Sequence, residues 1–212
     1  SKDVIDLISQ EIISEQGVTL LDVDMGCDTN RTVMTFAGEP VPVLNAAFKA
    51  MKKAAQLIDM RKHSGAHPRM GATDVCPLIP ISNISFEECI KHSINLAEKV
   101  GKELKIPVFL YEKSAVLSYR KNLAEIRKGE YESMESKISL KKWKPDFCSQ
   151  FNQKSGVTAI GVRNFLIAYN VNLSTQNKKI ANDIALDLRE QGRAKRDAKG
   201  KILRDNKYKI IK

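Results

Sequence analysis

The sequence predicts an α+β fold, a sandwich of the split βαβ kind in which helices pack on one face of a mixed sheet. One observation behind this is that segments with the apolar spacing of helices alternate with short β-rich segments along the 212 residues. Another is a composition of 42% hydrophobic and 28% charged residues, which is typical of a globular chain with a sizeable core.

A third observation is that two segments alternate apolar and polar side chains with the period of a β-strand. This alternation places polar groups on a face that the helices leave open, which is a natural place for a ligand. The polar side chains are Asp22, Asp24, Asn170 and Asn172, and those expected to face the helices are Leu21, Val23, Ile167 and Tyr169.

The first third of the chain predicts a helix, a hairpin and a second helix. Apolar residues at helical spacing predict a helix over residues 3–15, which ends before Gly17. Residues 18–37 are predicted to form an antiparallel hairpin, because residues 26–30 between its two apolar segments are rich in turn formers. The next apolar stripe predicts a helix over residues 44–58.

The middle of the chain predicts an edge strand followed by helices and a further strand. Residues 75–81 are apolar, but Pro77 and Pro80 cannot donate hydrogen bonds to a neighbouring strand, so this strand belongs at an edge or a bulge. Ser85 and Glu88 have the spacing of a capping box, which marks a helix start. The elements expected next are a helix at 86–104, a strand at 108–111 and a short helix at 123–127.

The last part of the chain predicts fewer elements. Residues 130–155 are polar and are expected to be irregular. Residues 156–162 and 164–173 are β-rich, and the second of these segments alternates strictly. A final helix is expected over residues 180–188, capped by Ser174 or Thr175.

The net charge of +10 is concentrated at the C-terminus, where residues 189–212 hold ten Lys or Arg and three Asp or Glu. Aromatic residues make up 6% of the chain, so the basic excess indicates a solvated tail rather than a nucleic-acid surface. No apolar run is long enough for a membrane helix. The cysteines lack the CxxC spacing of a zinc site and suggest free thiols in a reducing compartment; they are Cys27, Cys76, Cys89 and Cys148.

Two of the three histidines, His63 and His67, share one loop. Gly65 and Pro68 disfavour a helix there, so a zinc-binding pair is poorly supported. Neighbouring cations disfavour a protonated imidazole, so His67 would stay neutral and act as a base near pH 7. Taken singly, each histidine is slightly better explained as an ordinary surface residue. Asp24 also has a structural and a functional interpretation: it is a turn cap, or it stabilises a cationic substrate or orients a histidine.

Several motifs together resemble the glutamate formiminotransferases. The most specific is the block from Leu57 to Pro77, which contains IDMRKH and then HPRMG. The other matching segments are residues 20–24, 29–33, 144–147, 163–168 and 188–193. The resemblance covers residues 3 to 193, about nine-tenths of the chain.

The resemblance implies an enzyme that transfers the formimino group of N-formimino-L-glutamate to N5 of tetrahydrofolate, in histidine degradation and one-carbon metabolism. It implies a ferredoxin-like sandwich, His67 as general acid and base, and Asp24 at the site. Arg31, Arg69 and Arg163 are weaker candidates for binding the substrate carboxylates. The folate-binding residues that it implies are Cys148, Ser149, Gln150, Phe151, Asn152, Gln153, Lys154, Ser155 and Gly156.

The resemblance also sets expectations for partners and domains. Tetrahydrofolate is expected as a co-substrate, with no metal, and a cytoplasmic homo-oligomer is expected that binds neither nucleic acid nor membrane. Residues 1–193 are expected to form the N-terminal subdomain without the family's first strand, and residues 194–212 a basic tail or linker toward an absent C-terminal subdomain. The alternative function is a non-catalytic folate- or partner-binding relative. One departure is Cys148, where the family usually has glycine.

Overall fold

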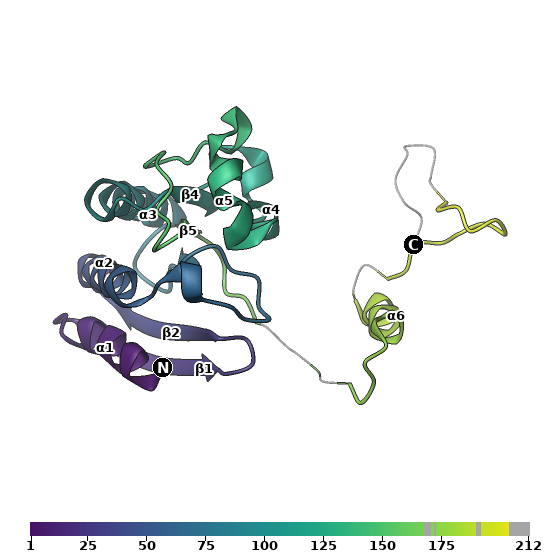
Figure 1. The fold of residues 1–212 in the computed structure, drawn as a ribbon, viewed down its shortest axis with the longest axis horizontal. Helices are drawn as coiled ribbons and strands as arrows, with labels where there is room; N and C mark the ends of the chain where they lie inside the picture. Colours follow the sequence, from purple (N-terminus) through teal and green to yellow (C-terminus); the bar gives the residue numbers. More distant parts are fainter. Residues whose placement is uncertain (168–170, 172, 190–191, 204–212) are drawn as a thin grey trace. The chain divides into compact units, whose positions relative to one another are not determined.

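The computed structural model describes residues 1–167, 171, 173–189 and 192–203. The chain divides into two compact units, Ser1–Phe165 and Leu166–Lys212. The first unit contains an antiparallel pair of strands and a three-stranded parallel sheet together with helices, so the predicted α+β class is confirmed (Figure 1).

The N-terminal part of the first unit is a hairpin with two helices on one side. Helix α1 (Lys2–Ile13) precedes strands β1 (Val18–Gly26) and β2 (Arg31–Gly38), and helix α2 (Pro40–Leu57) follows them. The strands pair antiparallel, as predicted, and both helices contact them (Figure 1). Apolar side chains of the two helices are buried, among them Ile8, Ile12, Ala47 and Met51.

A β-bulge in β1 changes which side chains face these helices. The register between the strands shifts between Leu20 and Asp22, so Leu21 is an extra residue and is 60% exposed. The prediction that Leu21 faces the helices was therefore wrong, because one inserted residue moves the alternation by one position. Asp22 and Asp24 lie on the exposed face, as predicted, and Val23 is half-buried.

The parallel sheet has the strand order β3-β5-β4. Strand β5 (Thr158–Val162) is central and all five of its residues are buried. It pairs in parallel with β3 (Val75–Leu78) on one side and β4 (Val108–Glu112) on the other. The two prolines correctly predicted that β3 lies at an edge.

Helices cover both faces of the parallel sheet, whereas the sequence analysis expected them on one face only. Helix α3 (Phe86–Lys99) lies on one face, and helices α4 (Leu123–Arg127) and α5 (Glu130–Ser139) lie on the other (Figure 1). Alternate residues of β4 point to opposite faces, so Leu110 packs on the side of α3 and Phe109 on the side of α4 and α5. Helix α5 occupies part of the segment at 130–155 that was predicted to be irregular. It was missed because only Met134 and Ile138 are buried apolar residues in it.

Local signals placed the other helices well. The capping box of Ser85 and Glu88 is present at the start of α3, which ends in a π-helical turn at Val100–Leu104. Short 3₁₀ turns lie at Met60–Lys62, Ser118–Arg120 and Lys141–Trp143. Among the residues described here, no helix is long and apolar enough to cross a membrane.

The second unit contains helix α6 (Lys178–Leu188). Its cap is Asn177, whose side chain accepts a hydrogen bond from the Lys179 amide, and not Ser174 or Thr175 as predicted. The strand expected at 164–173 is absent at residues 164–167, where Ile167 is 92% exposed. Tyr169, Asn170 and Asn172 lie outside the described residues, and the domain division at residue 193 stays a prediction.

Candidate active site

The loop that carries both histidines runs from the end of α2 to β3 and is anchored by buried methionines. Met60 and Met70 are almost fully buried. Asp59 accepts a hydrogen bond from the Arg61 amide, and the Arg61 guanidinium lowers the pKa of Asp59 to about 2. The backbone of the loop is therefore fixed at both ends, although its middle is exposed.

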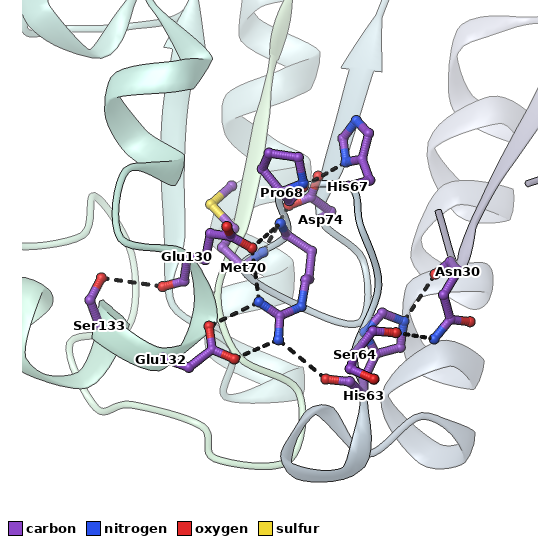
Figure 2. Close-up of polar contacts among 11 residues, drawn as sticks. Asn30, His63, Ser64, His67, Pro68, Met70, Asp74, Glu130, Glu132 and Ser133 are labelled. Atoms are coloured by element: carbon purple, nitrogen blue, oxygen red, sulfur yellow. Dashed lines mark hydrogen bonds and ion pairs between the residues drawn. The ribbon is translucent and has the colours of Figure 1, made fainter. Parts of the chain in front are cut away.

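His67 has one ring nitrogen occupied by its own neighbour. Its Nδ1 lies 2.6 Å from the carbonyl oxygen of Pro68 (Figure 2). Because a carbonyl oxygen only accepts, Nδ1 must carry the proton of the neutral ring, which assigns a lone pair to Nε2. Neutral His67 can therefore accept a proton at Nε2 without changing its tautomer.

His63 instead joins the loop to the hairpin. Its Nε2 lies 3.0 Å from the carbonyl oxygen of Asn30, while its Nδ1 is buried and has no hydrogen-bond partner within the described part of the chain. The Asn30 side chain also donates to the Ser64 carbonyl at 2.6 Å (Figure 2). Both ring nitrogens of His63 thus face protein, which fits a structural role.

The turn of the hairpin packs directly on this loop. A Cβ on Gly65 would lie 2.4 Å from the Thr29 carbonyl oxygen, so only glycine permits this approach. Arg31 pairs with Gly26 at the end of the hairpin, and Asp24 lies two residues before Gly26; both side chains are exposed. The structure thus brings the part of the hairpin that carries Asp24 and Arg31 to the loop of His67.

Arg69 is already paired within the protein. Its side chain is 13% exposed, and its two terminal nitrogens lie 2.9 Å from Glu130 and 2.5 Å from Glu132. One of them also donates to the His63 carbonyl at 3.2 Å. The hydrogen bond with Glu132 raises the pKa of Arg69, and Arg69 in turn lowers the pKa of Glu132. Arg69 therefore holds the loop, and its expected contact with a substrate carboxylate stays a prediction.

Helix α4 contacts the same loop at a second position, Asp74. Asp74 accepts a hydrogen bond from the Met70 amide at 3.0 Å and forms an ion pair with Arg127 of α4. Both partners of this ion pair are about 15% exposed. The turn from His67 to Asp74 is thus fixed by side chains of α4 and α5, which sequence reasoning did not identify.

The loop at 148–156, which the resemblance assigned to folate, begins at a buried anchor. The Asp146 carboxylate accepts hydrogen bonds from the Leu110 amide at 2.8 Å and from Arg120 at 2.9 Å. Phe147 packs on the core between α3 and the sheet, and Cys148 has a positive φ of 54°. A cavity of about 500 Å³ lies at this end of the loop, and its lining includes Lys102, Lys105, Cys148, Ser149 and Gln150.

The other end of the loop lies beside the histidine loop. The Met60 amide donates to Lys154 and the Ala72 amide to Ser155, each at 2.8 Å, and the Val157 amide donates to Met70 at 3.0 Å. Gly156 has a φ of 69°, and a Cβ there would lie 2.3 Å from the Met70 carbonyl oxygen. Two segments about 90 positions apart in the sequence are therefore side by side.

Arg163 is not part of this group. Its amide donates to Leu78 at the carboxyl end of β3, whereas Val157 contacts Met70 at the opposite end of β5. Six residues of extended chain span about 20 Å. Arg163 therefore lies at the opposite end of β5 from the contact between Val157 and Met70, and its role with substrate stays a prediction.

Sequence reasoning also missed the first turn of α5, where Glu130, Tyr131 and Glu132 contact both loops. A signal was present, because Tyr131, Met134 and Ile138 recur at helical spacing. No group of three or more His, Cys, Asp or Glu side chains that could hold a metal ion occurs among the residues for which the structure gives positions.

A histidine whose Nδ1 faces a carbonyl oxygen, in a loop that contacts both the hairpin turn and residues 154–157, defines a candidate acid–base site. Comparison with known families shows which family the chain belongs to. Residues 1–163 match the N-terminal subdomain of the formiminotransferase domain, and residues 168–208 match the formiminotransferase domain. The chain belongs to the formiminotransferase family.

Curated relatives agree with this assignment. A formimidoyltransferase-cyclodeaminase of Dictyostelium discoideum is 50% identical over 191 residues, which are 90% of this chain and 35% of the relative. The Rattus norvegicus formimidoyltransferase-cyclodeaminase is 48% identical over 203 residues, 95% of this chain and 37% of the relative. A glutamate formimidoyltransferase of Streptococcus pyogenes serotype M1 is 46% identical over 190 residues, 89% of this chain and 64% of the relative. The chain thus spans between about a third and two thirds of the length of these relatives.

Proposed function

We propose that this chain is part of a glutamate formimidoyltransferase, which moves the formimino group of N-formimino-L-glutamate to N5 of tetrahydrofolate. The observation that carries the proposal is the assigned tautomer of His67, whose Nδ1 is held by Pro68 while Nε2 keeps its lone pair. The family membership and the printed names of the relatives support the same activity. The activity places the protein in histidine degradation and one-carbon metabolism.

The transfer needs one group that first takes and then returns a proton. The N5 nitrogen of tetrahydrofolate forms a bond to the amidine carbon and loses its proton to Nε2 of His67. The bond between that carbon and the glutamate nitrogen then breaks, and Nε2 returns the proton to this leaving nitrogen. A general acid–base group of this kind typically accelerates a reaction by about 10²- to 10⁴-fold.

Asp24 has a complementary role in this proposal. The formimino group is a better electrophile when it carries a positive charge, and a nearby carboxylate favours that charge. Asp24 is exposed on the hairpin whose turn packs on the histidine loop, and this position supports the role.

The loop at 148–156 is proposed to bind tetrahydrofolate, and its position beside the histidine loop supports this. Of the three arginines predicted to bind a substrate carboxylate, Arg31 is the most available, since it is exposed, Arg69 is paired with Glu130 and Glu132, and Arg163 lies at the far end of β5. We further propose a homo-oligomer in the cytoplasm, where the free cysteines of this chain would remain reduced.

The test is glutamate release from N-formimino-L-glutamate by the full-length protein, with and without tetrahydrofolate. Folate-dependent release supports the transferase. Calorimetric binding of tetrahydrofolate without any glutamate release would instead identify a non-catalytic folate-binding relative. Absence of both binding and release would contradict the proposal.

A further inference from the structure

We propose that the first turn of α5 is a positioning element that sets the distance between the loop of His67 and the loop at 148–156, with Tyr131 as the residue that joins them. The inference rests on the proposed function, because it assigns folate to one loop and proton transfer to the other. Tyr131 contacts neither reacting group in this scheme and acts through the two loops.

On the histidine side, three consecutive residues of α5 hold Arg69, which lies two positions after His67. The Tyr131 amide donates a hydrogen bond to the Arg69 carbonyl oxygen at 2.9 Å. Glu130 and Glu132 bind the guanidinium, Glu132 through both of its carboxylate oxygens (Figure 2). Bidentate carboxylate–guanidinium pairs fix orientation as well as distance, so α5 determines the direction of this part of the loop.

On the folate side, Tyr131 uses its side chain. Its hydroxyl donates a hydrogen bond to the Gln153 carbonyl oxygen at 2.6 Å. Its ring lies 5.9 Å from the ring of Phe151, centroid to centroid, at an interplanar angle of 38°. One residue therefore holds a carbonyl of each loop, one through its amide and the other through its hydroxyl.

The turn that carries Tyr131 is itself held rigidly. Met134 and Ile138 of α5 are buried against Phe109 of the sheet. The residue before the helix, Gly129, has a φ of 89°, and a Cβ there would lie 2.1 Å from Oγ of Ser133. Because the packed core fixes α5, the core and not the exposed loops determines where Tyr131 lies.

This arrangement matters because proton transfer requires Nε2 of His67 within hydrogen-bond reach of N5 of the bound folate. A misplacement of about 1 Å can reduce a rate by about 10²-fold. We therefore expect a change at the contact with the loop at 148–156 and a change at the contact with Arg69 to alter different measured quantities. A change at its hydroxyl weakens folate binding, whereas a change at Glu132 misplaces His67 and lowers kcat.

The experiment compares Tyr131→Phe with Tyr119→Phe in the full-length protein. Tyr119 is a matched control, because it is also half-buried and its hydroxyl donates to a backbone carbonyl, that of Lys142, at 2.5 Å. We expect Tyr131→Phe to raise the tetrahydrofolate Kd by about 3- to 10-fold, the range for loss of one hydrogen bond. Tyr119→Phe should leave the Kd unchanged.

A second variant separates the two sides. Glu132→Gln should lower kcat by about 10-fold, because it weakens the hold on Arg69, with the tetrahydrofolate Kd within about two-fold of wild type. Equal effects of Tyr131→Phe and Tyr119→Phe on the Kd would overturn the proposal. So would a Glu132→Gln variant that keeps the wild-type kcat.

Hydrogen exchange gives a readout that needs no activity. Amides at 148–156 should exchange faster in Tyr131→Phe than in wild type or Tyr119→Phe, with thermal midpoints unchanged. If wild type neither binds tetrahydrofolate nor releases glutamate, the proposed function fails while the exchange result still decides whether Tyr131 couples the loops. Unchanged exchange of the amides at 148–156 in Tyr131→Phe would show that Tyr131 does not couple the two loops.

Discussion

Two histidines four residues apart in one loop differ in what their ring nitrogens contact. His63 faces the carbonyl of Asn30 with one nitrogen and the protein interior with the other. Within the described part of the chain, the His67 ring contacts its neighbour Pro68 through Nδ1, and its Nε2 has no hydrogen-bond partner. The sequence could not separate them, because both lie among the same cations and glycines. The separation depends on the hairpin turn, which is distant in sequence and reaches only one of the two rings.

This difference predicts the outcome of matched substitutions. In the full-length protein, His67→Gln should lower the transfer rate by about 10²- to 10⁴-fold, because glutamine cannot take up the proton. Tetrahydrofolate binding should stay within a few-fold of wild type, since His67 lies outside the loop at 148–156 that is proposed to bind folate. Glutamate release and calorimetric binding measure the two effects.

His63→Gln is the control for that prediction. It removes a hydrogen bond between the loop and the hairpin but no proposed proton acceptor, so the transfer rate should fall much less. An inactive His63 variant beside a normal His67 variant would reverse the assignment within the loop.

Among the structural elements, the sequence predicted those whose signals are local. The capping box of α3, the hairpin turn and the edge position of β3 each depend on a few neighbouring residues, and all three are confirmed. Helix α5 was missed because its polar residues outnumber its buried ones, and its place is decided by Phe109 and Ala159 of the sheet. The sequence also did not predict that helices cover both faces of the parallel sheet. Parallel pairing joins strands that are far apart in sequence, so no local signal indicates which helix packs on which face.

The start of α3 provides a test of stability. Ser85→Ala removes the hydroxyl that accepts from the Glu88 amide and donates to the Glu88 carboxylate, whereas the hydrogen bond from the Ser85 amide to Glu88 is kept. We expect the free energy of unfolding to fall by about 1 kcal/mol, the usual contribution of such a cap. Urea unfolding followed by circular dichroism measures the change.

The pH dependence of the same cap has a defined sign. Hydrogen bonds from the amide and hydroxyl of Ser85 lower the pKa of Glu88 below its ordinary value of 4.5. A lowered carboxyl pKa stabilises the fold above the ordinary value, and this stabilisation is lost as the pH falls through the lowered pKa. The stability difference between wild type and Ser85→Ala should therefore shrink below about pH 4.

Protein stability should be far more sensitive to the anchor of the loop at 148–156 than to a surface ion pair. Asp146→Ala would leave Arg120, whose side chain is 4% exposed, without its carboxylate. Loss of one partner of a buried pair typically lowers the free energy of unfolding by about 3–5 kcal/mol. Asp6→Ala removes an exposed pair with Lys2 and should change the unfolding curve little. Similar curves for the two variants would contradict the anchoring role of Asp146.

At the scale of the whole molecule, the site of the first unit combines segments from most of its length. The hairpin, the histidine loop, α5 and the loop at 148–156 are joined by hydrogen bonds. Only the family resemblance assigned the hairpin and the two loops to one site, and it did not predict α5. Physical reasoning alone found an open polar face and a histidine loop, but it had no means of pairing residues 60–72 with residues 154–157. Backbone hydrogen bonds make that pairing. Because every residue except proline has the same backbone donor and acceptor, the sequence pattern does not predict which segments pair in this way.

The two units should also differ in how much they contribute to stability. Within the described residues, every buried apolar side chain lies at or before Val162, and α6 contains no buried residue. Residues 196–212 are mostly polar and have little apolar surface to bury.

A chain of residues 1–165 should therefore unfold at the same temperature as residues 1–212, and so should a chain that lacks only 196–212. We expect the midpoints to agree within about 2 °C, since a difference of 1 kcal/mol moves the midpoint of a domain of this size by about that much or more. Thermal scans of the three chains by circular dichroism provide the measurement. A midpoint several degrees lower for residues 1–165 would mean that Ile180, Ile184 and Leu188 are buried in solution and stabilise the first unit.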